Sequence, residues 1–253
     1  MSTVKTFLIN LDRSPARLDF MRGQFETIGV DFVRIPAVDG ATLARSEYSG
    51  SPLGLGEIGC LLSHREAWRR LVASQDKFAA VFEDDARLSR GISPLLKDRG
   101  WIPPKAGIVK LETVLFKIRL AGRPIAAKSR VLKRLVSNHL GTAGYIIRRD
   151  QAERLLSLTA TFQAPVDHYM FTEPYLSEGV VYQISPAPVL QRSIFDDIGD
   201  DGAFTSLLGH GDGASKPKPK RPIHRKFADE LLRPFRQIRW KLAGIERTIV
   251  RFD

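Results

Sequence analysis

Residues 78–85 read Phe78-Ala79-Ala80-Val81-Phe82-Glu83-Asp84-Asp85, an apolar run of strand length that leads directly into three consecutive carboxylates. Open α/β sheets bind ligands at the carboxyl ends of their strands. Three adjacent acidic side chains at such an edge repel one another, so a divalent cation or a cationic partner would stabilise them. The stretch therefore predicts a metal and phosphate site. The alternative is that these residues only begin a solvated loop, with one carboxylate capping the next turn.

The segments on either side of this stretch alternate between strand and helix patterns. The helix over Ser14–Ile28 has the clearest signals, with Ser14 at its cap, Pro15 in its first turn and Gly29 after its end. Strands separated by helices predict an α/β fold with a mostly parallel, doubly wound central sheet. The further predicted strands are Thr6–Leu11, Phe32–Ile35, Gly107–Leu111, Gly144–Ile147 and Val180–Ile184, and the further helices run over Ile58–Val72 and from Asp150.

Length and cysteine content limit the class of protein. A chain of 253 residues can bury one large core with room for an appendage. The single cysteine, Cys60, argues against an internal disulfide framework and against any Cys-based zinc site, and it favours a reducing compartment. The first apolar run, Thr6–Leu11, is too short for a secretory signal, and no run reaches the roughly 18 to 20 apolar residues of a membrane-spanning helix. We expect neither element.

The basic charge of the chain is concentrated near its end. Residues 215–253 contain 12 Lys or Arg and four Asp or Glu, a net charge of +8, whereas the other 214 residues carry only +3 of the total +11. We therefore predict a domain over residues 1–213, followed by an extended basic linker over 214–225, where Lys-Pro repeats prevent helix formation.

Residues 226–253 are predicted to form a basic amphipathic helix. The apolar side chains that recur at helical spacing are Phe227, Leu231, Phe235, Ile238, Leu242, Ile245, Ile249 and Phe252. Such a helix is typical of binding to an anionic membrane surface. The alternative is packing on the body or on a second subunit. Nucleic acid is not expected as a partner, because no recognised binding motif or stacking aromatics accompany the charge.

Several co-ordered motifs resemble those of glycosyltransferase family 25, specifically its bacterial lipooligosaccharide or lipopolysaccharide galactosyltransferases. The likeness covers nearly all of residues 5–210, and motifs in one order are more specific than one acidic cluster. The motifs are Phe7–Asp12 with Arg17, Pro36–Gly40, Gly56–His64 with Trp68, Ala80–Asp85, Leu111-Glu112-Thr113, Gly141–Ile147, Pro165–Phe171 and Gln183–Gln191.

The resemblance implies a single GT-A-type, Rossmann-like domain that uses a nucleotide sugar with Mn²⁺ or Mg²⁺. Glu83-Asp84-Asp85 then stands where this architecture carries an Asp-x-Asp motif, with Glu at the first position. Asp85 is implied to bind the metal, with Glu83 beside it, while Glu83 and Asp84 reach the ribose, the metal waters or a basic neighbour. A hard cation bridging two phosphates would stabilise the nucleoside diphosphate leaving group.

The order of motifs also implies a catalytic base. In similar inverting enzymes a carboxylate lies near the start of a helix, and Asp167 after Pro165 matches that place. It would take the proton from the attacking acceptor hydroxyl, giving a β-configured product. Asp167 could instead cap its helix, or do both. Glu112, at another strand end, is the competing base.

Other candidates are weaker. Asn10, Arg13 and Arg17 lie where the first strand meets its helix and suit a diphosphate or uridine site, although Arg17 could be a surface charge. Asp39 could bind the nucleoside or form an Asx-turn. His64 appears opposite much of the apolar stripe of its helix and would ordinarily be structural. Further possible metal or phosphate contacts are His139 and Gln191.

Three functions remain open from the sequence. The first is transfer of galactose from UDP-galactose to a lipid-linked lipooligosaccharide or lipopolysaccharide glycan, through a β1,4 link suggested by family likeness, on the cytoplasmic face of a bacterial inner membrane. The second keeps the fold but uses UDP-glucose or UDP-N-acetylglucosamine, or a protein acceptor. The third is a non-catalytic basic protein that binds membrane or nucleic acid.

Overall fold

The computed structural model describes residues 3–173, 175–178, 180–194 and 244–253. The strands are β1 Lys5–Asn10, β2 Val33–Pro36, β3 Phe78–Glu83, β4 Ala86–Leu88, β5 Ile108–Lys110, β6 Glu112–Thr113, β7 Lys117–Ala127, β8 Arg130–Leu135, β9 Gly144–Arg148, β10 Val181–Ser185, β11 Val189–Gln191 and β12 Ile245–Ile249. The α-helices are α1 Pro15–Ile28, α2 Leu55–Ala73, α3 Ser93–Lys97, α4 Arg149–Leu158, α5 Val166–Phe171 and α6 Tyr175–Glu178.

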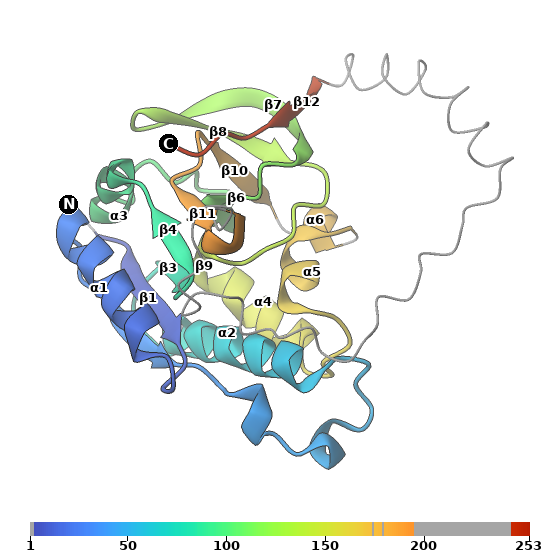
Figure 1. Cartoon of the computed structure of the whole chain (residues 1–253). Coiled ribbons are helices and arrows are strands. Elements are labelled where there is room, and N and C mark those ends of the chain that lie inside the picture. Colours follow the sequence, from blue (N-terminus) through green and yellow to red (C-terminus); the bar gives the residue numbers. More distant parts are fainter. Residues whose placement is uncertain (1–2, 174, 179, 195–243) are drawn as a thin grey trace, which may run out of the picture.

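Among these residues a nine-stranded sheet has the order β12-β7-β8-β10-β5-β9-β3-β1-β2 (Figure 1). The α/β class is as predicted, but the sheet is mixed. Strand β1 is parallel to β2 and β3, and β10 is parallel to β5, whereas the other pairings are antiparallel. Strand β9 lies between β3 and β5 and is antiparallel to both. The start of β9 therefore lies beside the carboxyl ends of β3 and β5.

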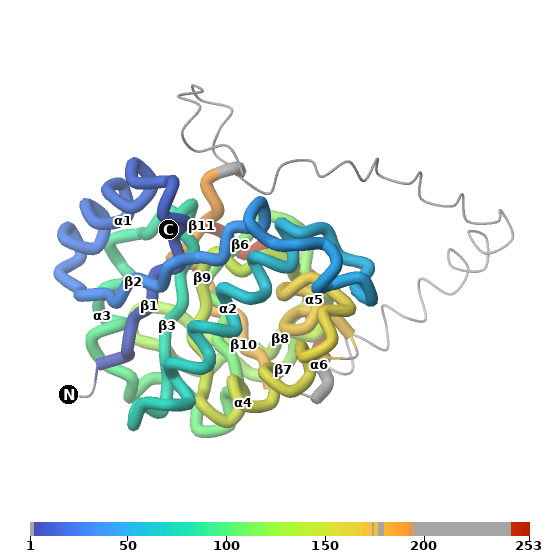
Figure 2. Tube along the Cα trace, turned by 90° about the horizontal axis from the view of Figure 1, so that it is seen from below, coloured from blue at the N-terminus to red at the C-terminus, as the bar shows by residue number. Residues whose placement is uncertain are grey.

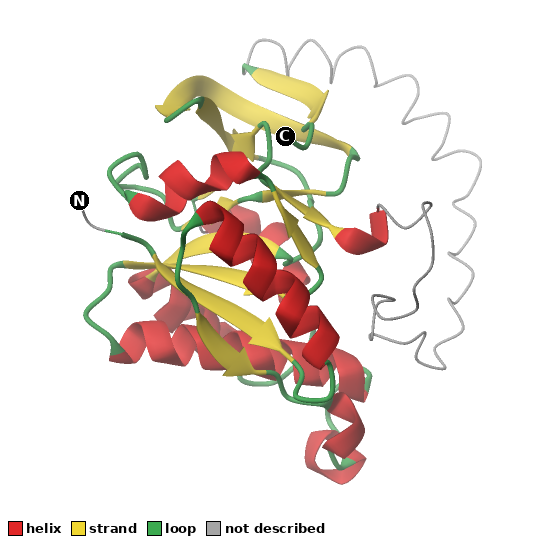
Figure 3. Cartoon of the chain, turned by 60° about the vertical axis from the view of Figure 1, so that its left-hand side comes forward, coloured by secondary structure: helices red, strands yellow, loops and turns green. Residues whose placement is uncertain are grey.

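Helices cover both faces of the sheet, which explains the continuous apolar run of β3. Val81 and Ala79 pack with α2 and α4 on one face, whereas Phe78, Ala80 and Phe82 pack with α1 and α3 on the other. Figures 2 and 3 show the strands lying between these two groups of helices. A strand buried on both faces has no polar side to alternate with, as its sequence predicts.

Helix α1 begins and ends where its sequence signals predict. Ser14 is the N-cap residue and Pro15 occupies the first turn, although the Ser14 side chain makes no capping hydrogen bond. Gly29 ends the helix at φ 62°, a left-handed conformation that glycine adopts without strain, and its N–H donates to the last turn. The start at Pro15 places Arg17 on the buried face with Leu18 and Met21.

The predicted C-terminal helix is wrong over residues 245–249. These residues form strand β12, which pairs antiparallel with β7. Gly244 at φ 63° turns the chain into the strand, and Ile245, Thr248 and Ile249 are β-branched residues that suit a sheet edge. Beyond β12, Val250 O accepts a hydrogen bond from the Thr113 hydroxyl at 2.7 Å. Residues 250–253 are not helical either, whereas the predicted linker and residues 226–243 of the predicted helix lie outside the described residues.

The hairpin β7–β8 and the small sheet β4-β11-β6 were not predicted. Strand β7 alternates poorly between apolar and polar residues, contains Pro124, and shifts register near Gly122. Edge and bulged strands tolerate such residues, because some of their backbone groups need no hydrogen-bond partner on a neighbouring strand. Among the described helices, none has both the length and the apolar character needed to cross a membrane.

Candidate functional site

The carboxyl ends of β1, β3 and β5 meet the entrance to β9 at one edge of the sheet. Register places Phe82 beside Gly144 and Lys110 beside Tyr145, so the acidic stretch lies next to the turn before β9. A cavity of about 640 Å³ lies at this edge. Its lining includes Glu57, Cys60, Glu83, Phe116, His139, Gly141, Thr142, Asp167, His168 and Gln191.

Asp84 is held by two side chains from the start of the chain. Its carboxylate lies 2.7 Å from an Arg17 nitrogen and accepts a hydrogen bond from Asn10 Nδ2 at 2.6 Å. Arg17 is only 5% exposed, so the alternative that it is a surface charge is wrong. Burial raises the pKa of Asp84, while Arg17 and Asn10 act to lower it. These contacts fix the direction of the acidic stretch.

Asp85 has a carboxylate oxygen without a partner. Its Oδ2 accepts from Gln191 Nε2 at 3.2 Å and lies 3.5 Å from Arg17, whereas the buried Oδ1 has no hydrogen-bond partner among the described residues. Burial, and after it the charge of Glu83, raises the pKa of Asp85 to about 7. An orphaned carboxylate oxygen in a buried acidic cluster fits the oxygen-ligand preference of Mn²⁺ or Mg²⁺.

Glu83 belongs to a hydrogen-bonded chain that reaches into the core. Its Oε1 lies 3.1 Å from His64 Nε2 and accepts from the Thr142 hydroxyl. Tyr145 OH lies 2.9 Å from His64 Nδ1 and accepts from Trp68 Nε1 at 2.9 Å. Every donor in this chain is paired when Tyr145 donates to Nδ1 and Nε2–H donates to Glu83. We assign His64 this tautomer, a neutral imidazole, because it leaves no donor without an acceptor.

His64 is fully buried, so its predicted place opposite the apolar stripe is wrong. Helix α2 is buried on more than one side, because it packs on both α4 and the sheet, and its buried positions include Gly59, Ser63 and His64. Desolvation of Glu83 acts to raise the pKa of that carboxyl, yet the hydrogen bonds from His64 and Thr142 hold it below its ordinary value.

Glu112 has both carboxylate oxygens engaged and does not line the cavity. Its Oε1 lies 2.6 Å from Lys110 Nζ, and its Oε2 accepts from Ala143 N–H at 2.6 Å. Gly141, at φ 99°, approaches so closely that an added Cβ would lie 2.3 Å from Glu112 Oε1. Glu112 thus positions the turn before β9, and this enclosed site does not suit a catalytic base.

Asp167 lines the cavity from the first turn of α5. Its carboxylate accepts from Gly141 N–H at 3.1 Å, which ties it to the turn that Glu112 positions. The N-cap of α5 is Pro165, so the alternative that Asp167 is the N-cap is wrong. Asp167 and Glu83 therefore face one cavity from different elements, as a base and a donor site would require.

The structure separates Arg13 and Asp39 from this cavity lining. They form an exposed ion pair at 2.7 Å, and Asp39 also accepts from Ala41 N–H at 3.0 Å, capping a short 3₁₀ helix. The Asx-turn alternative for Asp39 is confirmed. Neither residue lines the cavity. Both could contact a nucleotide only if it extended beyond the cavity, and that contact stays a prediction.

His139 lines the cavity as a buried neutral imidazole. Its Nδ1 donates to Gln183 Oε1 at 2.9 Å, because the Gln183 amide nitrogen is already directed at backbone carbonyls. Its Nε2 has no hydrogen-bond partner among the described residues. Burial, and to a smaller extent Lys110, lowers the pKa of His139 to about 3.

The His139→Gln substitution should make folding less sensitive to acid. The unfolded chain binds a proton near the ordinary histidine pKa of about 6.5, but the folded protein does not until pH falls to about 3. Between these values acid favours the unfolded state of the wild type only. At pH 4 the wild type should therefore lose up to about 3 kcal/mol more unfolding free energy than the variant, relative to pH 7.5. Urea unfolding at several pH values measures this, and parallel curves would contradict it.

Sequence reasoning missed four polar residues of the site: Lys110, Thr142, Tyr145 and Cys60. Thr142 and Tyr145 lie in the Gly141–Ile147 motif, and their hydroxyl groups are the signal that could have identified them. Lys110 ends an otherwise apolar strand, and a charged residue in a buried strand is a usable signal of a paired site. Cys60 lies four residues before His64, a spacing that shares one helix face.

A family profile and several curated relatives match this chain. The family profile described as "Glycosyltransferase family 25 (LPS biosynthesis protein)" matches residues 3–170. The chain is 34% identical over 147 residues to "Lacto-N-neotetraose biosynthesis glycosyltransferase LgtE" of Neisseria meningitidis serogroup B, covering 54% of this chain and 52% of the relative. It is 32% identical over 166 residues to LgtB of the same organism, covering 61% and 60%.

A longer match is to "Lipooligosaccharide biosynthesis protein lex-1" of Haemophilus influenzae, 31% identical over 202 residues and covering 74% of this chain and 66% of that protein. The chain thus spans about half to two thirds of the length of these relatives. Among solved structures, a glycosyltransferase involved in glycosylation of the major capsid of PBCV-1 aligns with a TM-score of 0.37 at 8% identity, a similarity too low to carry weight.

Proposed function

This chain belongs to glycosyltransferase family 25, and we propose that it transfers galactose from UDP-galactose to a hydroxyl of a lipooligosaccharide or lipopolysaccharide glycan, with inversion to a β1,4 link. The relatives named for lacto-N-neotetraose and lipooligosaccharide biosynthesis support the acceptor class. The observation that carries the proposal is one cavity that contains Asp167 and adjoins the buried acidic cluster. A sugar-nucleotide transferase needs a base for the acceptor hydroxyl and a cation site for the donor diphosphate next to each other.

The acidic cluster would hold the donor diphosphate through a divalent cation. Asp85, with its unpaired Oδ1, is the expected ligand, and Glu83 is the expected neighbour. Mn²⁺ or Mg²⁺ bound there would neutralise charge on the departing nucleoside diphosphate. Arg17 and Asn10 keep Asp84 fixed and so hold the backbone of the cluster in place. His64 does the same for Glu83.

Asp167 would act on the acceptor side of the cavity. Its carboxylate would take the proton from the attacking hydroxyl as that oxygen attacks the anomeric carbon of the donor sugar. Gly141 N–H holds one carboxylate oxygen, and the turn carrying Gly141 is itself held by Glu112 and Lys110. Attack from the side opposite the leaving diphosphate gives the inverted product.

We further propose that the enzyme works at the cytoplasmic face of the bacterial inner membrane. The net charge of +8 in residues 215–253 supports attraction to anionic lipid, since each Lys or Arg near such a surface contributes about 1 kcal/mol. A lipid-linked acceptor would be met at the same surface. Strand β12, the described part of that segment over Ile245–Ile249, pairs with β7 of the body.

The assignment is tested by incubating the purified protein with a panel of UDP-sugars, with and without Mn²⁺, and measuring UDP release. We expect metal-dependent turnover of UDP-galactose. Asp85→Asn should reduce the rate about 10²- to 10³-fold, because it removes the carboxylate that would hold the cation against the leaving diphosphate. Asp98→Asn is the matched control and should keep full activity, because Asp98 is a partly exposed aspartate that pairs with Lys128 away from the cavity.

Other outcomes separate the remaining possibilities. Turnover of only UDP-glucose or UDP-N-acetylglucosamine would keep the mechanism and overturn the galactosyl assignment. Absence of turnover together with absence of UDP-sugar binding in calorimetry would overturn the enzyme assignment and favour a membrane- or polyanion-binding protein. The anomeric configuration of the product, read by NMR, tests inversion separately.

A further inference from the structure

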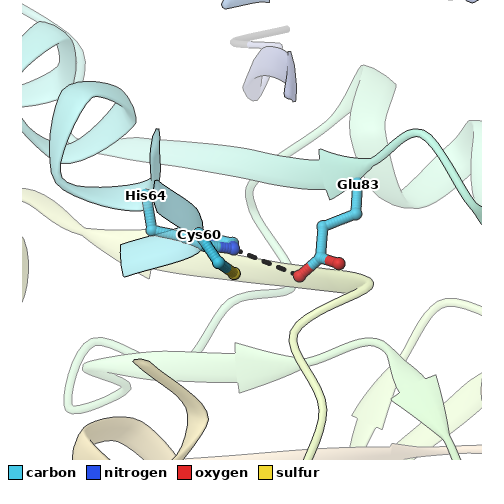
Figure 4. Close-up of side chains that lie close together, drawn as sticks. All are labelled: Cys60, His64 and Glu83. Carbon is cyan, nitrogen blue, oxygen red and sulfur yellow. Dashed lines mark hydrogen bonds and ion pairs between the residues drawn. The ribbon is translucent and has the colours of Figure 1, made fainter. Parts of the chain in front are cut away.

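Cys60, His64 and Glu83 bring three different metal-ligating atoms together. Cys60 and His64 are four residues apart on α2, hence on one face of the helix, and Glu83 ends the neighbouring strand β3. The Cys60 Sγ, a His64 ring nitrogen and a Glu83 carboxylate oxygen all lie within 4.8 Å of one another. Figure 4 shows the three side chains directed toward a common point.

The geometry points to a site for a borderline-soft divalent cation of the Zn²⁺ type, and we propose that Cys60, His64 and Glu83 bind it. The single cysteine predicted no Cys-based zinc site, but His64 and Glu83 complete a mixed donor set around Cys60. A thiolate, an imidazole and a carboxylate are the donor set that Zn²⁺ takes in proteins. Mn²⁺ and Mg²⁺ prefer oxygen ligands, so this site differs in kind from the one expected at Asp85. The two share only the neighbourhood of Glu83.

The imidazole is already oriented as metal sites require. Metal-bound histidines are usually held through their other ring nitrogen. Here His64 Nδ1 lies 2.9 Å from Tyr145 OH, and Trp68 holds that hydroxyl in place from the other side. His64 Nε2 and Glu83 Oε1, 3.1 Å apart, converge on one shared proton. A cation would take the place of that proton between the same two atoms.

The site has room for a fourth ligand. Cys60 and Glu83 both line the 640 Å³ cavity, whereas His64 lies fully buried behind them. Three protein ligands with one side open to a cavity is the arrangement of Zn²⁺ sites that keep a water or substrate ligand. The cation would thus be reachable from solvent without unfolding of α2.

Binding changes protonation in a defined way. The thiol of Cys60 loses its proton to solvent and ligates as thiolate, because the thiolate is the metal-binding form. The imidazole stays neutral and carries its proton on Nδ1 instead of Nε2, and the Tyr145 hydroxyl turns to accept from that Nδ1–H instead of donating to Nδ1. One proton is therefore released for each cation bound, and no oxidant or reductant is involved.

Co²⁺ as a spectroscopic probe tests the site in the untagged full-length protein. Thiolate ligation of Co²⁺ gives an absorption band from charge transfer, and Cys60 is the only cysteine of the chain, so any such band reports this residue. We expect one Co²⁺ per chain, displaced by one equivalent of Zn²⁺. Zn²⁺ should also protect the Cys60 thiol of the unmodified protein from alkylation, a measurement that needs no variant.

Three variants distinguish this site from chance binding through sulfur. Glu83→Gln should weaken Zn²⁺ binding at least tenfold by removing a ligand. Tyr145→Phe should weaken it about 10- to 100-fold by releasing the hold on His64 Nδ1. His168→Gln is the matched control, since His168 lines the same cavity outside the cluster and should leave affinity unchanged.

The proposal would be overturned if no thiolate band formed, or if the band and affinity persisted in Glu83→Gln and Tyr145→Phe. It would also be overturned if Zn²⁺ left the rate of Cys60 alkylation unchanged. All of these readouts measure binding alone, so they stand or fall independently of sugar transfer.

Discussion

The Asp167→Asn variant should transfer sugar about 10²- to 10⁴-fold more slowly than the wild type, with little change in KM for the donor. The proposed role of Asp167 is to remove a proton from the attacking hydroxyl, and an amide cannot accept that proton. The Asn oxygen can still accept from Gly141 N–H, so the turn before β9 should stay in place. The loss should therefore appear in kcat rather than in stability or donor binding.

Single-turnover rates with saturating donor measure this effect, and thermal unfolding checks the fold. Asp150→Asn is the matched control, because Asp150 also lies in the first turn of a helix but is exposed and paired with Arg148. It reproduces the loss of negative charge at a helix start without touching the cavity. If Asp167→Asn kept more than a tenth of the activity, Asp167 would not be the base.

Glu112 provides a second comparison for the same question. It is fully buried, with one carboxylate oxygen on Lys110 and the other on Ala143 N–H. Burial raises the pKa of Glu112, and Lys110 acts against that rise. Its substitution should therefore lower activity together with stability, whereas Asp167→Asn should lower activity alone.

The local parts of the fold could be predicted because their signals are local. Ser14, Pro15 and Gly29 mark the ends of α1 through backbone rules that need no tertiary contact. Residues 78–82 are all apolar and of strand length, which predicts a strand buried on both faces. That strand predicts that Glu83-Asp84-Asp85 lies at an edge of the sheet, and the structure places it at the carboxyl end of β3.

The remaining features depend on which strands are neighbours, and periodicity does not contain that information. The direction of β9 cannot be read from its sequence, yet it brings Thr142 to Glu83. The burial of His64 follows from α2 packing against several elements at once. Ile245 and Ile249 fit a helical spacing, but they equally fit alternate positions of a strand, and the free edge of β7 decides the outcome.

Replacing Lys110 by Met should lower the free energy of unfolding by about 3 to 5 kcal/mol, because it leaves Glu112 buried and charged without its partner. Lys110 is fully buried, and its Nζ donates to Glu112 Oε1 at 2.6 Å and to Gly141 O at 2.5 Å. It also lies 3.9 Å from the centre of the Phe171 ring. Desolvation lowers the pKa of Lys110, and Glu112 opposes that shift, so each charge is tolerated only because of the other.

The double variant Lys110→Met with Glu112→Gln separates this ion pair from simple loss of packing. It removes both charges, and the Gln oxygen can still accept from Ala143 N–H, so the double variant should unfold at a higher urea concentration than Lys110→Met alone. Lys128→Met, which breaks the surface pair with Asp98, is the matched control and should leave the midpoint nearly unchanged. Additive losses in the double variant would instead mean that Lys110 stabilises the protein through its packing on Phe171 and its bonds to the turn.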